Sequence, residues 1–308
     1  MINIAPIILF AYNRPAHTKR TVEALQKNDL AIQSDLYIYS DQAIDSKDVT
    51  AVEAVRKYVK TIRGFNRITY VYHAYNKGLA KSIIDGVSEV LQNYEKVIVL
   101  EDDLETSPTF LRYMNQALEF YSPEQVWSIG GYSPRIQIPQ DYKYDTYLAY
   151  RNCSWGWATW KQNWEKTDWE VSDFNDFFKD QNQRTNFERG GNDLSMMLLK
   201  QQKRIIQSWS IRFNYAAYKN NLPSVYPTQS YIKNLGVDGS GTNMKKSSKY
   251  DSVLNVSKHV DFLFVPDHKF ESSITDRFKK FYNTSLYRSV INWFKTQQAV
   301  RIIQRNLH

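Results

Sequence analysis

Three consecutive carboxylates, Glu101, Asp102 and Asp103, follow the apolar run 97–100. At the end of a buried strand these charges would repel one another unless a cation lies beside them. A hard divalent ion such as Mg²⁺ or Mn²⁺ binds one or two carboxylates together with substrate phosphates, so the triplet predicts a metal-dependent phosphate site. The alternative is an acidic turn that caps the next helix, because the positive N-terminus of a helix also favours carboxylates.

The elements that must position this triplet alternate between strand and helix signals. The predicted strands are 7–11, 36–40, 68–72 and 97–100, and the predicted helices between them are 15–27, 48–62 and 79–93. This order implies a largely parallel sheet covered by helices on both faces. Such sheets bind ligands beyond the carboxyl ends of their strands, so functional residues are expected just after each strand.

Composition excludes several classes of protein. The 308 residues, 42% hydrophobic and 23% charged, suit one large or two modest soluble domains. No stretch approaches the roughly 18 uncharged apolar residues of a spanning helix, which argues against an integral membrane protein. The single cysteine, Cys153, fits a reducing compartment. The apolar N-terminal run has no basic segment before it, so no signal peptide is expected and a cytoplasmic location is the prediction.

Most of the net charge lies in the C-terminal tail. Residues 277–308 contain seven Lys and Arg and no acid, and so carry +7 of the chain's formal +8. The nearly neutral remainder argues against a nucleic-acid-binding protein. Phe278, Phe281, Leu286 and Val290 have helical spacing. A basic amphipathic helix of this kind either lies on an anionic membrane or docks on the protein's own core, and the spacing is compatible with both.

The acidic turn also resembles a known family. The run from Glu101 to Glu105, followed by Ser107-Pro108, is similar to the metal-binding turn of GT-A glycosyltransferases, in particular the N-acetylglucosaminyltransferase I type and related bacterial sugar transferases. The segment 11–15, Ala-Tyr-Asn-Arg-Pro, resembles the nucleotide-binding entry of the same family.

The resemblance implies a fold and a division of the chain. The fold is an α/β GT-A fold, with a Rossmann-like, mostly parallel central sheet, helices on both faces and a C-terminal helical basic tail. Residues 1–130 would form the nucleotide-sugar-binding half and residues 131–275 the acceptor-binding half, with 276–308 as the tail.

It also implies roles around the acidic turn. Asp103 would bind Mn²⁺, or Mg²⁺, which bridges the two phosphates of the donor. Asp102 would face the ribose or the sugar, and Glu101 would support the turn from behind. Arg14 suits a phosphate or base contact because its guanidinium offers paired donors, and a salt bridge to the acidic turn is a compatible alternative.

Further implied contacts lie after the other strands. Tyr12 would stack on the base, and Asp41 would accept a hydrogen bond from a base N–H unless it only caps a turn. Asn76 and Gly78 belong to a turn that resembles the Asn-x-Gly turn of related inverting transferases, where Gly78 either relieves crowding near the donor or simply makes the turn.

The acceptor half supplies the remaining candidates. Trp155 and Gly156 resemble the segment under the donor sugar, with a tryptophan-rich core as the alternative. Asp193 at the start of a predicted helix is the candidate general base, which an inverting transferase needs to take a proton from the acceptor hydroxyl. The alternative for Asp193 is an ordinary helix cap, and Glu188 is the second choice of base.

The predicted function is a metal-dependent inverting glycosyltransferase, hexosyl or N-acetylhexosaminyl. It would use a nucleotide sugar, by resemblance a UDP-sugar, and a glycan or lipid-linked oligosaccharide acceptor in bacterial surface polysaccharide synthesis. The tail would bring it to the inner face of the cell membrane. The alternatives are a sugar nucleotidyltransferase, disfavoured because residues 11–15 contain no glycine, and a non-catalytic GT-A-like binding module.

Overall fold

The computed structural model describes residues 4–238, 248–257 and 260–285. Its strands are β1 (Ile7–Ala11), β2 (Asp35–Ser40), β3 (Arg67–Tyr72), β4 (Lys96–Glu101), β5 (Leu104–Thr106), β6 (Ile129–Gly130), β7 (Thr146–Ala149), β8 (Trp157–Trp160), β9 (Ser224–Pro227) and β10 (Ile232–Asn234). Within the described residues they form an eight-stranded sheet in the order β3-β2-β1-β4-β8-β6-β9-β7 and a two-stranded sheet of β10 and β5.

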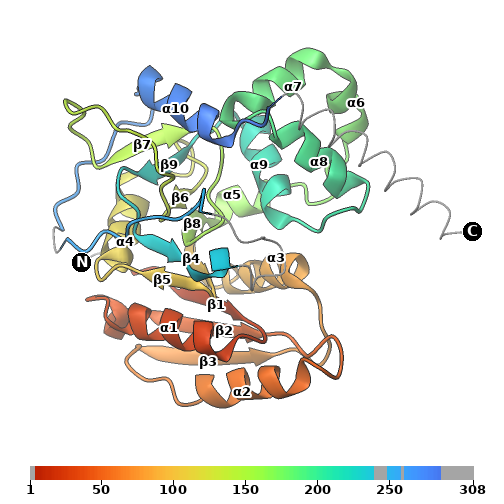
Figure 1. Ribbon diagram of the computed structural model, residues 1–308, viewed down its shortest axis with the longest axis vertical. Helices are drawn as coiled ribbons and strands as arrows, with labels where there is room; N and C mark the ends of the chain where they lie inside the picture. Colours follow the sequence, from red (N-terminus) through yellow and green to blue (C-terminus); the bar gives the residue numbers. More distant parts are fainter. Residues whose placement is uncertain (1–3, 239–247, 258–259, 286–308) are drawn as a thin grey trace, which may run out of the picture.

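The helices lie between these strands in chain order (Figure 1). They are α1 (Pro15–Gln26), α2 (Val49–Val59), α3 (Leu79–Val90), α4 (Phe110–Phe120), α5 (Lys161–Glu165), α6 (Phe174–Lys179), α7 (Gln181–Phe187), α8 (Leu194–Gln202), α9 (Trp209–Lys219) and α10 (Ser272–Tyr282). None of the helices in the described ranges is both long and apolar enough to cross a bilayer.

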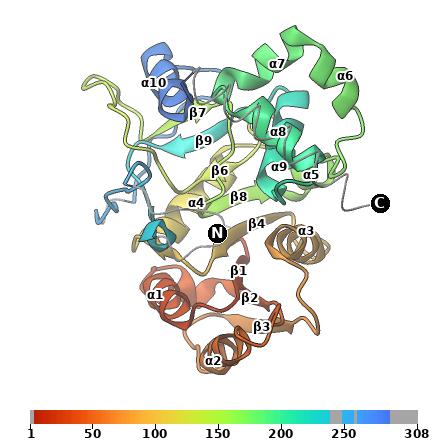
Figure 2. The same cartoon turned by 45° about the vertical axis from the view of Figure 1, so that its right-hand side comes forward.

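The half of the large sheet from β3 to β4 is parallel, as the alternation of strand and helix predicted. Successive side chains of a strand point to opposite faces, so both faces of β1 must be covered. Ile7 and Leu9 pack in one cluster with residues of α1, α2 and α4. Ile8 and Phe10 pack in a second cluster with residues of α3 and α9. Figure 2 shows α1 and α3 on opposite sides of β1, which confirms the predicted layers.

In the other half of the sheet, neighbouring strands run both parallel and antiparallel to one another. β8 runs antiparallel to β4, with Val99 opposite Trp157. The ring of Trp157 is 1% exposed and stacks on Trp164 and Trp209 at centroid distances of 5.7 and 4.7 Å. The alternative to a place under the donor sugar was that this segment belongs to a tryptophan-rich core. Trp157 does belong to such a core.

The C-terminal helix α10 packs on the protein itself. Ile274 and Phe278 are 1% and 2% exposed, and Phe278 contacts the rings of Tyr147 and Tyr226 on β7 and β9. Docking on the core, one of the two alternatives for the predicted tail, therefore holds for α10. The rest of that tail, residues 286–308, lies outside the described residues.

Candidate active site

Residues that follow β1, β2 and β4 meet around one cavity of about 920 Å³. Phe10 of β1 lies opposite Glu101 of β4 in a parallel pair, so the turns after these strands are neighbours at the carboxyl edge of the sheet. The sequence-predicted residues that line the cavity are Tyr12, Arg14, Asp41, Asn76, Gly78, Asp102, Asp103 and Trp155. Gly156 and Asp193, also predicted from the sequence, are not among the described residues that line it.

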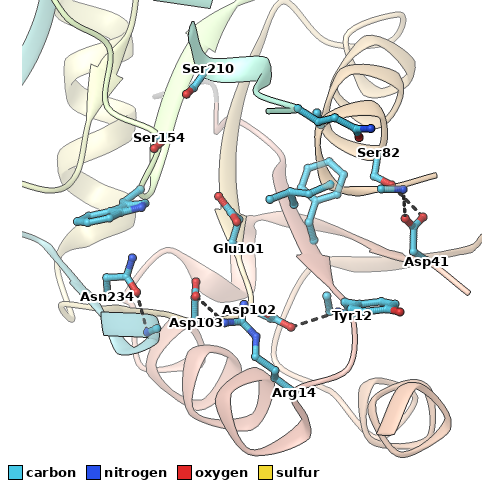
Figure 3. A pocket seen from close by; sticks show the side chains of 18 of the residues that line it. Tyr12, Arg14, Asp41, Ser82, Glu101, Asp102, Asp103, Ser154, Ser210 and Asn234 are labelled. Atoms are coloured by element: carbon cyan, nitrogen blue, oxygen red, sulfur yellow. Dashed lines mark hydrogen bonds and ion pairs between the residues drawn. The ribbon is translucent and has the colours of Figure 1, made fainter. Parts of the chain in front are cut away.

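Arg14 holds the acidic turn. One guanidinium nitrogen, Nη1, lies 2.8 Å from Asp103 Oδ2, and Nη2 donates to Asp102 Oδ1 (Figure 3). Asp102 is 2% exposed and also accepts from the backbone N–H of Tyr12 at 3.1 Å. Burial raises the pKa of Asp102, while the Arg14 charge acts in the opposite direction. Asp102 therefore connects the turns after β1 and β4 through buried hydrogen bonds. The alternative role predicted for Arg14, a salt bridge to the acidic turn, is present.

Glu101 differs from its expected position behind the turn. Its carboxylate points into the cavity, on the side away from Arg14 (Figure 3). It has no hydrogen-bond or ion-pair partner in the part of the chain that the structure describes. Burial, followed by repulsion from Asp103 and Asp102, raises the pKa of Glu101 to about 8. The direction of a side chain at a strand end depends on the register of the sheet, which the sequence pattern alone did not specify.

Asp41 organises the turn after β3. Its Oδ2 accepts from the backbone N–H groups of Lys77 and Gly78, both at 3.0 Å. Its Oδ1 accepts from Ser82 Oγ at 2.8 Å and is 2.6 Å from Nδ1 of His73. The carboxylate lines the cavity, but its two oxygens already bind four groups of the protein. Asp41 therefore caps this turn, which was the predicted alternative to a contact with the base.

The turn itself requires glycine. Gly78 has a φ of +76°, and its N–H also lies 3.0 Å from Asn76 Oδ1. A Cβ at Gly78 would meet only Gln207 Oε1, at an ordinary 3.5 Å. The backbone conformation, rather than lack of space, is thus the reason for glycine here.

Tyr12 is fixed at the cavity wall by its hydroxyl. The hydroxyl donates to Asp48 Oδ2 at 3.0 Å and accepts from the backbone N–H of Ile44 at 2.9 Å. Asn13 Nδ2 binds the other oxygen of Asp48 at 2.9 Å. The ring of Tyr12 is therefore held in place before any ligand arrives.

Trp155 lines the opposite side of the cavity, next to other aromatic rings. Its ring meets Tyr132 and Tyr250 edge-to-face at centroid distances of 4.7 and 5.7 Å. Gly156 lies behind it at a φ of +57°, where a Cβ would come within 2.6 Å of the Ile232 side chain. Gly156 therefore allows close packing behind the wall, whereas Trp155 faces the cavity.

Asp193 is engaged by an arginine that the sequence analysis did not single out. Arg151 Nη1 and Nη2 donate to Asp193 Oδ1 and Oδ2 at 2.8 and 3.0 Å. Arg151 itself lines the cavity, so it lies between the carboxylate and the open space. The sequence analysis had no signal for Arg151, because β7, the strand that precedes it, was not predicted.

The acidic turn fits a divalent cation of the kind the family uses. Among the described residues no group of three or more His, Cys, Asp or Glu side chains could hold a metal ion alone. Asp103 nevertheless has an oxygen, Oδ1, with no hydrogen-bond partner among these residues. The Arg14 guanidinium binds two of the three carboxylates of the turn, and the pKa of Glu101 is raised by burial and by repulsion from Asp103 and Asp102. Such a donor set suits Mg²⁺ or Mn²⁺ that takes further ligands from a diphosphate.

Comparison with known proteins identifies one family. A sequence model described as glycosyl transferase family 2 matches residues 7–201, which is more than half of the chain. No curated protein sequence matches the chain.

Several solved structures are similar at low identity. The mannosyltransferase PcManGT from Pyrobaculum calidifontis, in complex with GDP-Man and Mn²⁺, is 13% identical over 53% of this chain and 48% of its own, with a TM-score of 0.36. TarS of S. aureus is 12% identical over 74% and 36%, with a TM-score of 0.38. UDP-glucose pyrophosphorylase complexed with UDP-glucose is 12% identical over 75% and 94%, with a TM-score of 0.37. The chain thus spans about half of PcManGT and about a third of TarS, and these likenesses carry no argument about activity.

Proposed function

This chain belongs to glycosyl transferase family 2, and on that premise we propose that it is a metal-dependent inverting transferase. It moves a hexosyl or N-acetylhexosaminyl group from a UDP-sugar to a hydroxyl of a glycan or lipid-linked oligosaccharide in bacterial surface polysaccharide synthesis. The observation that carries the proposal is the carboxylate triplet Glu101-Asp102-Asp103 at the edge of the cavity of about 920 Å³, with Arg14 bound to Asp102 and Asp103. The resemblance of the acidic turn predicted a GT-A glycosyltransferase, and the family match agrees with a glycosyltransferase and gives no support to the nucleotidyltransferase alternative.

Asp103 is the proposed metal ligand. Its Oδ1, which has no partner among the described residues, would hold Mn²⁺ or Mg²⁺, and such an ion neutralises charge that develops on the diphosphate leaving group. Arg14 keeps Asp103 in place through Oδ2, and its guanidinium is also close enough to the turn to bind a phosphate oxygen. Glu101, whose carboxylate points into the cavity and has no partner among the described residues, is proposed to accept hydrogen bonds from hydroxyls of the donor.

The side of the cavity formed by residues 1–130 is proposed to bind the nucleoside. Tyr12 offers an aromatic ring whose position is fixed through its hydroxyl, which suits stacking on a base. Asn76 and Gly78 also line the cavity, on a turn that Asp41 fixes by hydrogen bonds. We propose that Asp41 acts on the base mainly by fixing this turn, with a direct contact to a base N–H as a secondary role.

Residues 131–275 are proposed to bind the acceptor. Trp155 offers an apolar face for a sugar ring, and Asp193 is the proposed base. A hydroxyl of the acceptor gives its proton to a carboxylate oxygen of Asp193 while its own oxygen attacks the anomeric carbon. The bond from that carbon to the diphosphate oxygen breaks, and its electron pair leaves with the diphosphate. Attack opposite the leaving group inverts the anomeric configuration.

Attack by this route requires a rearrangement of one contact. Both oxygens of Asp193 accept from Arg151, so the acceptor hydroxyl must replace one of these two hydrogen bonds. Arg151 remains hydrogen-bonded to the other oxygen and keeps the carboxylate oriented.

The tail is proposed to act at a membrane surface. Residues 277–308 carry +7, and α10, whose buried face is docked on the sheet, leaves Lys280 exposed. A cationic segment of this kind is attracted to anionic lipids at the inner face of the cell membrane, where a lipid-linked acceptor would lie.

A melting-temperature screen tests the proposed donor class. The panel is UDP-glucose, UDP-galactose, UDP-N-acetylglucosamine, UDP-N-acetylgalactosamine and GDP-mannose, each with Mn²⁺ and with EDTA. A ligand at 100 times its Kd adds about 2.7 kcal/mol to the free energy of unfolding, so the true donor raises the melting temperature by several degrees. A UDP-sugar should do so only with Mn²⁺, and a shift with GDP-mannose alone would reject the UDP assignment.

A further inference from the structure

The C-terminal helix α10 reaches the candidate active site, although the family match ends at residue 201 and assigns it no role. Its last residue, Tyr282, lines the same cavity as Arg14 and Asp103. The helix is anchored on the sheet by the buried Phe278, whose ring lies 4.9 Å from that of Tyr226. Its end is therefore held at a fixed place beside the cavity.

Reciprocal hydrogen bonds join the end of α10 to the residue before Asp193. The backbone N–H of Asn192 donates to Asn283 Oδ1 at 3.0 Å, and Asn192 Nδ2 donates to the Thr284 carbonyl at 3.0 Å. In return the N–H of Thr284 donates to Asn192 Oδ1 at 2.7 Å. These bonds fix the backbone and the side chain of Asn192 together.

The two segments also approach closely. Gly191 has a φ of +137°, and a Cβ there would lie 2.8 Å from the Cβ of Tyr282. A larger residue at position 191 would push α10 away from the loop before α8. The glycine thus permits the contact in which Tyr282 and the 191–193 segment lie side by side.

Tyr282 also covers the arginine that binds Asp193. The guanidinium carbon of Arg151 lies 4.0 Å from the centre of the Tyr282 ring. Stacking on an aromatic face restricts the plane of a guanidinium, and this plane determines where its paired N–H groups point. Here they point to the two carboxylate oxygens of Asp193.

We propose that Tyr282 at the end of α10 is a positioning residue, which holds Arg151 and through it the Asp193 carboxylate in the orientation used for proton transfer. The proposal rests on the proposed function of Asp193 as base. According to this proposal the C-terminal helix contributes to catalysis and does not serve only to attach the protein to a membrane.

The test compares three variants with the wild-type chain. Tyr282→Leu removes the ring over Arg151, and Tyr282→Phe keeps it. Ile274→Val is the matched control, because it weakens the packing of the same helix at a buried residue eight positions before Tyr282. Each is assayed for UDP release at saturating donor, using the UDP-sugar that gives the largest Mn²⁺-dependent shift in the melting screen. UDP affinity with Mn²⁺ and amide hydrogen exchange of residues 190–195 are measured in parallel.

The expected result is specific to the ring. Tyr282→Leu lowers the turnover number at least tenfold and speeds exchange at Asn192, with UDP affinity within twofold of wild type. Tyr282→Phe recovers at least a third of the turnover. Ile274→Val lowers the melting temperature but keeps turnover within twofold of wild type below it. The proposal is overturned if Tyr282→Leu keeps wild-type turnover, or if Ile274→Val loses as much turnover as Tyr282→Leu.

One further variant separates this inference from the proposed function. Asp193→Asn should abolish UDP release while UDP binding persists. If Asp193→Asn is inactive and Tyr282→Leu is not, the base assignment stands and the positioning role is rejected. If Asp193→Asn keeps wild-type turnover, the base assignment itself is wrong and the positioning role falls with it.

Discussion

Arg14 and Asp103 are joined by an ion pair of 2.8 Å, although 89 positions separate them in the sequence. The same guanidinium binds Asp102, so one side chain after β1 holds the two carboxylates after β4. Because β1 and β4 are adjacent parallel strands, the ion pair connects the two turns that follow them, and residues of both turns line the cavity. Arg14 therefore has a structural role in the site in addition to any contact with a donor phosphate.

Loss of this guanidinium should destabilise the fold. Arg14→Gln leaves Asp102, whose side chain is 3% exposed, as a buried charge without a cationic partner. Removal of one member of a buried pair costs about 3–5 kcal/mol. The matched control is Arg20→Gln, whose pair with Glu105 is exposed and should be worth less than about 1 kcal/mol. Urea unfolding measures both variants, and equal stabilities for the two would contradict the role of Arg14.

Stability without metal should fall as pH rises. The folded-state pKa of Glu101 is raised to about 8, so the folded protein binds this proton more tightly than the unfolded chain does. The free energy of unfolding therefore decreases between about pH 4.5, the ordinary range of a glutamate, and about pH 8. Glu101→Gln should flatten this slope in urea unfolding with EDTA, whereas Glu105→Gln should not. A wild-type slope in Glu101→Gln would show that other groups cause the decrease.

Asp41→Asn should weaken both the fold and nucleotide binding. The amide has one acceptor oxygen, which cannot serve both the N–H groups of Lys77 and Gly78 on one side and Ser82 and His73 on the other. We expect a loss of about 1–3 kcal/mol in the free energy of unfolding and a weaker affinity for UDP. Asp45→Asn, an exposed residue of the neighbouring loop, is the control. Wild-type UDP affinity in Asp41→Asn would refute the role of the turn in binding.

The two parts of the tail should behave differently on truncation. A chain that ends at residue 285 keeps the buried Phe278 and the contacts of Tyr282, so UDP release should persist while binding to anionic liposomes weakens. A chain that ends at residue 276 lacks Phe278 and exposes the rings of Tyr147 and Tyr226, so its melting temperature should fall. Liposome co-sedimentation checks the first expectation, and undiminished binding by the chain ending at 285 would refute membrane attachment by residues 286–308.

The first half of the fold could be predicted from the sequence because its strands are buried on both faces. All five residues of β1 are buried, so they form an uninterrupted apolar run, and the helices that follow have clear apolar faces. The strands of the other half have two to four residues each, too short for a periodicity to be recognised. For the same reason the antiparallel pairing of β8 with β4 was not predicted. The helix α9 was also missed, although it has 11 residues.

The site was predictable where it follows these strands and not where it depends on tertiary contacts. Tyr12, Asp41 and Asp103 come directly after strands and line the cavity. The pairing of Arg151 with Asp193 joins residues 42 positions apart, with β8 and the helices α5 to α7 between them, and no local pattern reveals it. Tyr282 was interpreted only as part of a basic tail, because its contact with Arg151 depends on how α10 docks.

Affinity for UDP with Mn²⁺ and with EDTA, measured by calorimetry, tests most directly whether Asp103 holds a metal that binds the diphosphate. We predict that Mn²⁺ raises the affinity of the wild-type chain at least tenfold. It should raise that of Glu105→Gln equally, because Glu105 is not among the described residues that line the cavity. In Asp103→Asn the affinity should be the same with Mn²⁺ and with EDTA. A tenfold increase that persists in Asp103→Asn would contradict the metal site and the transferase mechanism built on it.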